Sequence, residues 1–188
     1  KDIFSHSAAH LMAAAVKNIF PKVKFGIGPS IEDGFYYDFD SAPFSTEDLE
    51  NIESEMQKIV EKDIAFERKD ISKSQAKTMF KEEPYKLELL EEVDRPSIYT
   101  LGKFTDLCRG PHVPSSGYIK AFKLLKTSGA YWKGNSNNKM LQRIYGTAFP
   151  EKKLLEKHLN LMEEAEKRDH RKIGQVMNLF SIHDEAPG

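Results

Sequence analysis

The apolar positions at the start of the chain recur at the spacing of a helix. Residues 3–20 are rich in alanine, leucine and methionine, which are good helix formers. One helical face would carry Phe4, Ala8, Leu11, Ala15 and Ile19. Pro21 follows directly, as prolines often do after a helix end. The pattern therefore predicts a helix over residues 3–20.

Helical and strand-like patterns then follow one another along the chain. Helices are predicted over residues 45–62, 72–83, 85–93 and 151–172, and Ser45 with Asp48 has the spacing of a capping box. Strands are predicted over residues 23–27, 35–39, 65–71, 97–101, 103–107, 118–132 and 139–149. Because no strict βαβ rhythm is present, we expect an α+β fold with a largely antiparallel sheet, packed helices and a long charged C-terminal helix.

Composition adds limits to this picture. The 188 residues are 39% hydrophobic and 30% charged, which is typical of one medium globular domain with room for an appendage. The net charge of −1 gives no sign of a polyanionic partner. The single cysteine, Cys108, excludes an internal disulfide and favours a reducing compartment. No apolar run approaches the roughly 18 residues of a transmembrane helix.

Two short pairs of side chains are candidates for chemistry. His6 and His10 are four positions apart on the predicted first helix, so both imidazoles share one face. Cys108 and His112 form a second pair in a loop that contains Gly110 and prolines. Nitrogen and sulfur donors of this kind suit a zinc site, and histidines equally suit acid–base chemistry. Taken singly, such pairs are more often structural, and their spacing does not choose between zinc and metal-free hydrolysis.

Three further side chains have weaker local signals. Asp106 shares a strand face with Cys108, and a carboxylate there could bind an α-amino group. Locally, Lys86 is typical of a solvated lysine, and Tyr37 of sheet packing. Basic residues interleave with aromatic ones after the cysteine loop, a pattern that can bind a nucleic acid but is more often a solvated face. This stretch comprises Lys120, Lys123, Lys126, Lys133, Lys139 and Arg143, with Tyr118, Tyr131 and Trp132.

Longer strings resemble the second N-terminal domain, the editing domain, of bacterial-type threonyl-tRNA synthetases. They are HSAAHL at residues 6–11, IGP at 27–29, GFYYD at 34–38 and DLCRGPHV at 106–113. Similar strings follow: GAYW at 129–132, NNKMLQRIYGT at 137–147 and RDHRKIG at 168–174. The resemblance covers essentially the whole chain.

The resemblance implies a division of the chain and an activity. Residues 1–150 would be the editing domain, an aminoacyl-tRNA deacylase, residues 151–174 a linker helix, and residues 175–188 the start of a truncated class II catalytic core. The expected reaction is hydrolysis of mischarged seryl-tRNA(Thr) to serine and free tRNA in the cytoplasm. Ligase activity, ATP and the zinc of the core would belong to the missing catalytic domain.

The resemblance also implies roles for individual residues. The expected catalytic residues are His6, His10, Lys86, Cys108 and His112, and the expected substrate-binding residues are Asp106, Tyr37 and Gly28. His6 and Lys86 would position or activate water, Asp106 would bind the serine ammonium group, and Gly28 would limit the side chain admitted. Tyr37 would contact the terminal adenosine of the tRNA.

One alternative to this reading stays open. The related alanyl-tRNA editing domains use the same paired motifs to hold zinc, whereas hydrolysis in the threonyl family looks metal-free. We therefore expect no cofactor, with zinc on His6, His10, Cys108 and His112 as the alternative. That alternative would make the chain a non-catalytic, zinc-stabilised tRNA-binding module.

Overall fold

A computed structural model describes residues 2–168 of the protein. The helices are α1 (Asp2–Ile19), α2 (Thr46–Glu61), α3 (Lys73–Met79), α4 (Pro84–Glu91) and α5 (Lys152–Lys167), with short 3₁₀ turns η1 (Ser116–Tyr118) and η2 (Trp132–Gly134). The strands are β1 (Lys24–Phe25), β2 (Ser30–Ile31), β3 (Gly34–Asp40), β4 (Phe66–Asp70), β5 (Ser97–Leu101), β6 (Phe104–Leu107), β7 (Ala121–Tyr131) and β8 (Met140–Phe149).

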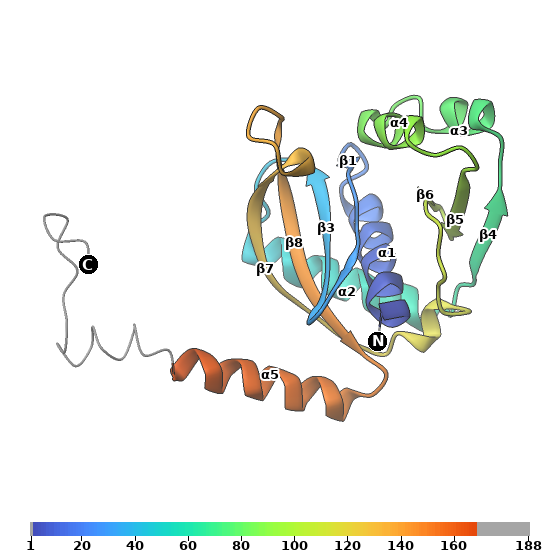
Figure 1. Cartoon of the computed structure of the whole chain (residues 1–188). Coiled ribbons are helices and arrows are strands. Elements are labelled where there is room, and N and C mark those ends of the chain that lie inside the picture. The colour runs from blue at the N-terminus through green and yellow to red at the C-terminus, as the bar shows by residue number, and fades with distance from the viewer. Residues whose placement is uncertain (1, 169–188) are drawn as a thin grey trace, which may run out of the picture.

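The strands form two antiparallel sheets. The larger has the order β1-β3-β8-β7, with β2 also paired to β3, and the smaller has the order β4-β5-β6. Helix α1 lies between the two sheets, and α3 and α4 lie together near one end of both (Figure 1). Within the described residues every strand pair is antiparallel. The expected α+β class with an antiparallel sheet is confirmed.

Helix α1 is the centre of the main core. It contacts α2 and strands of both sheets, so apolar residues are buried on most of its circumference. Leu11, Met12 and Val16 have no exposed surface, and neither have Phe35 and Phe39 on the facing strand β3. Burial of such side chains stabilises a fold by roughly 1.5–3 kcal/mol each. The polar exceptions on this buried helix are therefore candidates for function.

Capping boxes fix two helix starts, and the first of them was predicted. Ser45 and Asp48 form a reciprocal capping box at α2, in which each side chain bonds the backbone N–H of the other residue. Ser72 and Gln75 do the same at α3. Pro84 opens α4, where its missing N–H costs no helical hydrogen bond. These caps fix where the chain enters each helix.

Two predicted strands are shorter in the structure. The strand predicted over residues 118–132 begins at Ala121, because residues 116–118 form the turn η1. The Ser116 hydroxyl fixes this turn by donating to the Ile59 carbonyl at 2.8 Å while accepting from the Ile64 N–H at 2.8 Å. The strand predicted over residues 23–27 is reduced to β1, Lys24–Phe25.

The predicted C-terminal helix extends beyond the described residues. Helix α5 covers Lys152–Lys167, whereas the helix was expected to reach residue 172, and the linker residue 174. The rest of that helix and the expected start of a catalytic core at 175–188 lie outside the described residues. The proposed domain boundaries stay predictions. Among residues 2–168, no helix combines the length and the apolar character needed to cross a membrane.

Candidate active site

The two predicted motifs meet at one place, and different elements position them. Helix α1 holds His6 and His10 one turn apart, with ring centroids separated by 5.0 Å. Strand β6 ends at Leu107, so Cys108 and His112 follow on the loop that leaves the small sheet. The His112 ring centroid lies 4.3 Å from those of both His6 and His10.

The donor atoms of these four residues form a tight cluster. The Cys108 Sγ atom lies 3.4 Å from His6 Nε2 and 3.3 Å from His112 Nε2. One donor atom from each of the four residues lies within 4.8 Å of all the others. The backbone N–H of Gly110 also donates to Cys108 Sγ, at 3.2 Å. Folding thus brings together two pairs that are about 100 residues apart in sequence, as the separation of His6 and Cys108 shows.

A second, charged cluster adjoins the first. Tyr37 on β3 donates its hydroxyl to Asp106 Oδ2 at 2.6 Å, and Lys86 Nζ on α4 donates to the same hydroxyl oxygen at 3.0 Å. Lys86 also forms an ion pair with Asp106 Oδ1. All three side chains are nearly or fully buried. His10 Nε2 lies 3.7 Å from Asp106 Oδ2, which connects the charged cluster to the imidazoles.

Gly28 lies directly against the ring of Tyr37. A Cβ atom at this position would come within 2.1 Å of Tyr37 Cδ2, which is far inside van der Waals contact. Only glycine fits this close approach while the ring keeps its place. All eight residues predicted for the site are therefore brought together, while their roles stay predictions.

Burial keeps the imidazoles uncharged. Loss of hydration lowers the pKa of His6, although the Pro111 backbone and the charge of Asp106 act in the opposite direction. Loss of hydration, with His6 and Lys86 nearby, lowers the pKa of His10 well below its usual value. The same burial lowers the pKa of His112 to about 2. At neutral pH the cluster therefore consists of neutral rings, which can accept a proton.

The thiol and the phenol keep their protons for the same reason. Burial raises the pKa of Cys108 to about 12, with the Asp106 charge adding to the shift. Burial first, and then Asp106, raises the pKa of Tyr37 well above its usual value. A protonated thiol is a poor nucleophile. The arrangement therefore favours activation of water by a neutral imidazole over attack by Cys108.

The donor set also fits a zinc ion. Three imidazoles and one thiol are common zinc ligands, and donors at most 4.8 Å apart need only a modest contraction to surround the metal. Zinc would have to replace the thiol proton, because a thiolate is the ligand form. The residues present therefore fit either a metal-free site or a zinc site.

Sequence reasoning did not single out three residues that shape this site. Ser7 is fully buried and lies 3.0 Å from His112 Nδ1 through its Oγ atom. Phe66 stacks on the His112 ring at a centroid distance of 4.9 Å, and Tyr99 meets its edge at 4.4 Å. Ser7 stands inside the string HSAAH, so its place between the two histidines was the available signal. Phe66 and Tyr99 carried no comparable signal.

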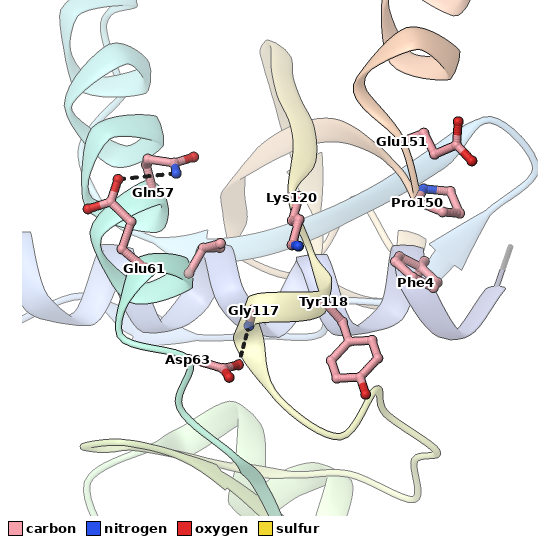
Figure 2. Close-up of a pocket in the computed structure, with 10 residues that line it drawn as sticks. Phe4, Gln57, Glu61, Asp63, Gly117, Tyr118, Lys120, Pro150 and Glu151 are labelled. Carbon is pink, nitrogen blue, oxygen red and sulfur yellow. Dashed lines mark hydrogen bonds between the residues drawn. The ribbon is translucent and has the colours of Figure 1, made fainter.

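Small cavities flank the site, and a larger one lies elsewhere. A cavity of about 190 Å³ is lined by Lys86, and another of about 250 Å³ by Cys108 and Arg109. A larger cavity, of about 880 Å³, lies between the end of α2, the turn η1 and the start of α5 (Figure 2). There Asp63 accepts the Gly117 N–H at 3.0 Å and so serves the turn. None of the eight predicted site residues lines this larger cavity.

The basic stretch on β7 and β8 is largely neutralised by acids. Lys123 pairs with Glu53 at 2.8 Å, Lys139 with Asp40 at 2.8 Å, and Arg143 with the buried Asp38 at 2.7 Å. Lys133 pairs with Glu88 and Glu92 at 2.7 and 2.5 Å, respectively. Trp132 is buried, with 3% of its surface exposed. This stretch is therefore not a continuous basic surface.

Part of the chain that includes three of the site residues is similar to a known domain family. Residues 97–145, which include strands β5 to β7 and the cysteine loop, match the family described as the threonyl and alanyl tRNA synthetase second additional domain. This part of the chain is therefore similar to that domain. The match includes Asp106, Cys108 and His112 of the site.

Over its whole length, the chain is similar to threonine–tRNA ligases. The chain is 59% identical to a threonine–tRNA ligase of Carboxydothermus hydrogenoformans, over 100% of the chain and 31% of the relative. It is 56% identical to one from Lawsonia intracellularis and 53% identical to one from Thermotoga neapolitana, each over 100% of the chain and 30% of the relative. The chain is therefore similar over its whole length to a segment of these threonine–tRNA ligases, and it spans about 30% of their length.

Proposed function

We propose that the chain is the post-transfer editing segment of a threonyl-tRNA synthetase, which hydrolyses the ester of seryl-tRNA(Thr) in the cytoplasm. The observation that carries the proposal is the convergence of His6, His10, Cys108 and His112 within 4.8 Å. The buried pair of Lys86 and Asp106 beside them adds a cation and an anion next to neutral rings. This combination suits an ester that carries a free ammonium group.

His6 is the proposed base. Its lowered pKa leaves the ring neutral at physiological pH, so it can take a proton from water beside the ester carbonyl. General-base help of this kind contributes roughly 10²–10⁴-fold to a rate. Lys86 positions the water or stabilises the negative charge that develops on the carbonyl oxygen. Serine and free tRNA(Thr) are the products.

Asp106 is the proposed partner of the serine ammonium group. Its carboxylate is oriented by Tyr37 and Lys86, so it presents a fixed acceptor beside His10. Gly28, by its contact with Tyr37, sets the space for the side chain and excludes the extra methyl of threonine. A second site is needed because one methyl group provides only about 1–3 kcal/mol of discrimination in a charging site. Contact of Tyr37 with the adenosine stays a prediction.

The direct experiment follows the ester. The chain is mixed with Ser-tRNA(Thr) and Thr-tRNA(Thr), and the loss of each amino acid is measured over time. We expect loss of serine with threonine retained. A seryl ester of adenosine serves as a second substrate, since it does not depend on contacts made by the rest of a tRNA.

Variants make the experiment specific to the site. His6→Ala and Lys86→Ala should lower the rate by roughly 10²–10⁴-fold, the contribution of general-base catalysis. His158→Ala is the matched control, because His158 lies on α5 against Phe149 and outside the cluster. A folded chain, by circular dichroism, that leaves both seryl esters intact would overturn the proposal.

The second candidate is a zinc-stabilised tRNA-binding module without catalysis. The compact set of four donors is the observation that favours it. This candidate predicts one zinc ion per chain, unfolding on chelation and no loss of serine. Metal analysis of the purified chain and the deacylation assay with and without chelator separate the two candidates.

A further inference from the structure

A buried serine connects the two motifs of the site. Ser7 lies on α1 between His6 and His10 and has no exposed surface. The backbone N–H of Val113 donates to Ser7 Oγ at 3.0 Å, and the same oxygen lies 3.0 Å from His112 Nδ1. The serine side chain therefore crosses from the helix to the cysteine loop.

The direction of the bond between Ser7 and His112 follows from counting donors and acceptors. A hydroxyl has one proton to donate and two lone pairs to accept with. Val113 N–H can only donate, so it occupies a lone pair of Ser7 Oγ. Within residues 2–168, Ser7 Oγ makes hydrogen bonds with Val113 and His112 alone. Because a buried hydroxyl that fails to donate costs about 1–3 kcal/mol, its proton goes to His112 Nδ1.

That direction fixes the proton on the other ring nitrogen. A neutral imidazole whose Nδ1 accepts a hydrogen bond carries its proton on Nε2. His112 Nε2 faces the cluster, 3.3 Å from Cys108 Sγ. Phe66 stacks on the ring with an interplanar angle of 9°, which opposes a change of ring orientation. His112 then presents an N–H donor to the cluster.

We infer that Ser7 is a positioning residue that fixes His112 in the Nε2–H tautomer, so that the ring offers a hydrogen-bond donor on the side of the His6, His10 and Cys108 cluster. The catalytic consequence rests on the proposed function: the donor would face an oxygen of the seryl ester. Zinc on His112 Nε2 requires the opposite tautomer, in which Nδ1–H donates to Ser7 Oγ. The tautomer of one ring therefore also distinguishes the metal-free site from the zinc site.

The first test needs no substrate. In the ¹⁵N-labelled chain at neutral pH, long-range ¹H–¹⁵N spectra distinguish protonated from unprotonated ring nitrogens, and the His112→Gln spectrum assigns the signals. We expect His112 Nε2 protonated and Nδ1 unprotonated. Protonation at Nδ1 instead would overturn the inference, and this result depends on no variant at Ser7.

Variants at Ser7 then test its part in the tautomer. Ser7→Ala should lose the preference for Nε2–H, and Ser7→Thr, which keeps a hydroxyl, should restore it. Ser5→Ala is the matched control, because Ser5 is also buried on α1 and its Oγ has no hydrogen-bond partner among residues 2–168. A His112 spectrum unchanged by Ser7→Ala would show that the serine does not set the tautomer.

Kinetics link the tautomer to the proposed hydrolysis. Ser7→Ala should lower kcat about tenfold, the equivalent of one hydrogen bond in the transition state, with little change in KM. Ser7→Thr should recover most of this loss. A wild-type chain with the expected tautomer but no deacylation would overturn the proposed function and leave the inference about Ser7 intact. Equal kcat in Ser7→Ala and wild type would contradict the catalytic consequence.

Discussion

At the scale of single residues, the site combines neutral rings with one buried ion pair. The three imidazoles lose their charge because burial removes hydration, and Cys108 keeps its proton for the same reason. Lys86 and Asp106 compensate each other's charge, and Tyr37 completes the hydrogen bonding of the carboxylate. These groups contact one another across elements: Tyr37 lies on β3, Lys86 on α4 and Asp106 on β6.

Tyr37→Phe tests the hydrogen bond to the buried carboxylate. Removing the hydroxyl leaves Asp106 Oδ2 without its 2.6 Å donor, so the free energy of unfolding should fall by about 1–3 kcal/mol. Tyr36→Phe is the matched control on the other face of β3, since among the described residues the Tyr36 hydroxyl has no hydrogen-bond partner. Urea unfolding measures both. Equal effects of the two substitutions would contradict the assigned role of Tyr37.

The imidazoles also predict how stability depends on pH. Each has a folded pKa below its unfolded value of about 6.5, so below that pH the unfolded chain binds protons that the folded chain does not. The free energy of unfolding should therefore be highest above about pH 6.5. Below that pH it should fall by up to about 1.4 kcal/mol per pH unit for each imidazole. For His112, whose folded pKa is about 2, the loss continues through the acid range.

Urea unfolding between about pH 7 and pH 5 measures this slope before most carboxylates titrate. His112→Gln should give a shallower slope than the wild-type chain, whatever its absolute stability. His158→Gln is the comparison outside the cluster. Stability that stays constant or rises as the pH falls would contradict the neutral state of the rings.

At the scale of residues, the sequence predicted those site residues that occur in short motifs. The pairs His6–His10 and Cys108–His112 could be found from their spacing and from the resemblance of their strings. Lys86 was locally typical of a solvated lysine, because its side chain contacts Tyr37 on β3 and Asp106 on β6, which are distant in sequence. The role of Ser7 depends on a contact across 105 positions, which periodicity does not reveal.

At the scale of elements, α1 is the support on which the site is built. Its small residues Ala8 and Ala9 have no exposed surface, so neighbouring elements pack closely around the helix that carries both histidines. Helix boundaries were predictable within a few residues because caps and prolines mark them. The turn η1 was not, because Ser116 holds it through contacts with the distant residues Ile59 and Ile64.

Capping of α2 gives one prediction at this scale. Ser45→Ala removes the side-chain acceptor at the helix start, so stability should fall by about 0.5–2 kcal/mol. Ser54→Ala, at an exposed position inside the same helix, should be neutral or slightly stabilising because alanine has the higher helix propensity. Thermal unfolding of both variants checks this. A larger loss for Ser54→Ala would contradict the assigned cap.

The loop between β1 and β2 gives a second prediction at the scale of elements. Gly28→Ala places a Cβ atom 2.1 Å from Tyr37 Cδ2, so the ring must move. We expect a loss of stability of about 1–3 kcal/mol, typical of overpacking, together with slower deacylation of the seryl ester. Gly129→Ala is the control, because its Cβ would meet only the flexible, half-exposed Met140 side chain. A stable, fully active Gly28→Ala chain would contradict the close-packed site.

At the scale of the whole molecule, two sheets enclose one helix, and the site lies where all three meet. Strand β3 of the large sheet supplies Tyr37, the small sheet leads into Cys108 and His112, and α1 supplies the other two imidazoles. The α+β class was predictable from the order of patterns along the chain. The sheet order β1-β3-β8-β7 was not, because it pairs strands about 100 residues apart.

A crystal structure with a non-hydrolysable seryl-adenosine analogue tests the central claim most directly. The claim is that one cleft between α1 and the cysteine loop receives the seryl end of a tRNA. We expect the serine group within hydrogen-bond distance, about 2.6–3.2 Å, of His6, Lys86 or Asp106. An analogue bound in the cavity of about 880 Å³ beside Tyr118, with the histidine cluster unoccupied, would contradict the account.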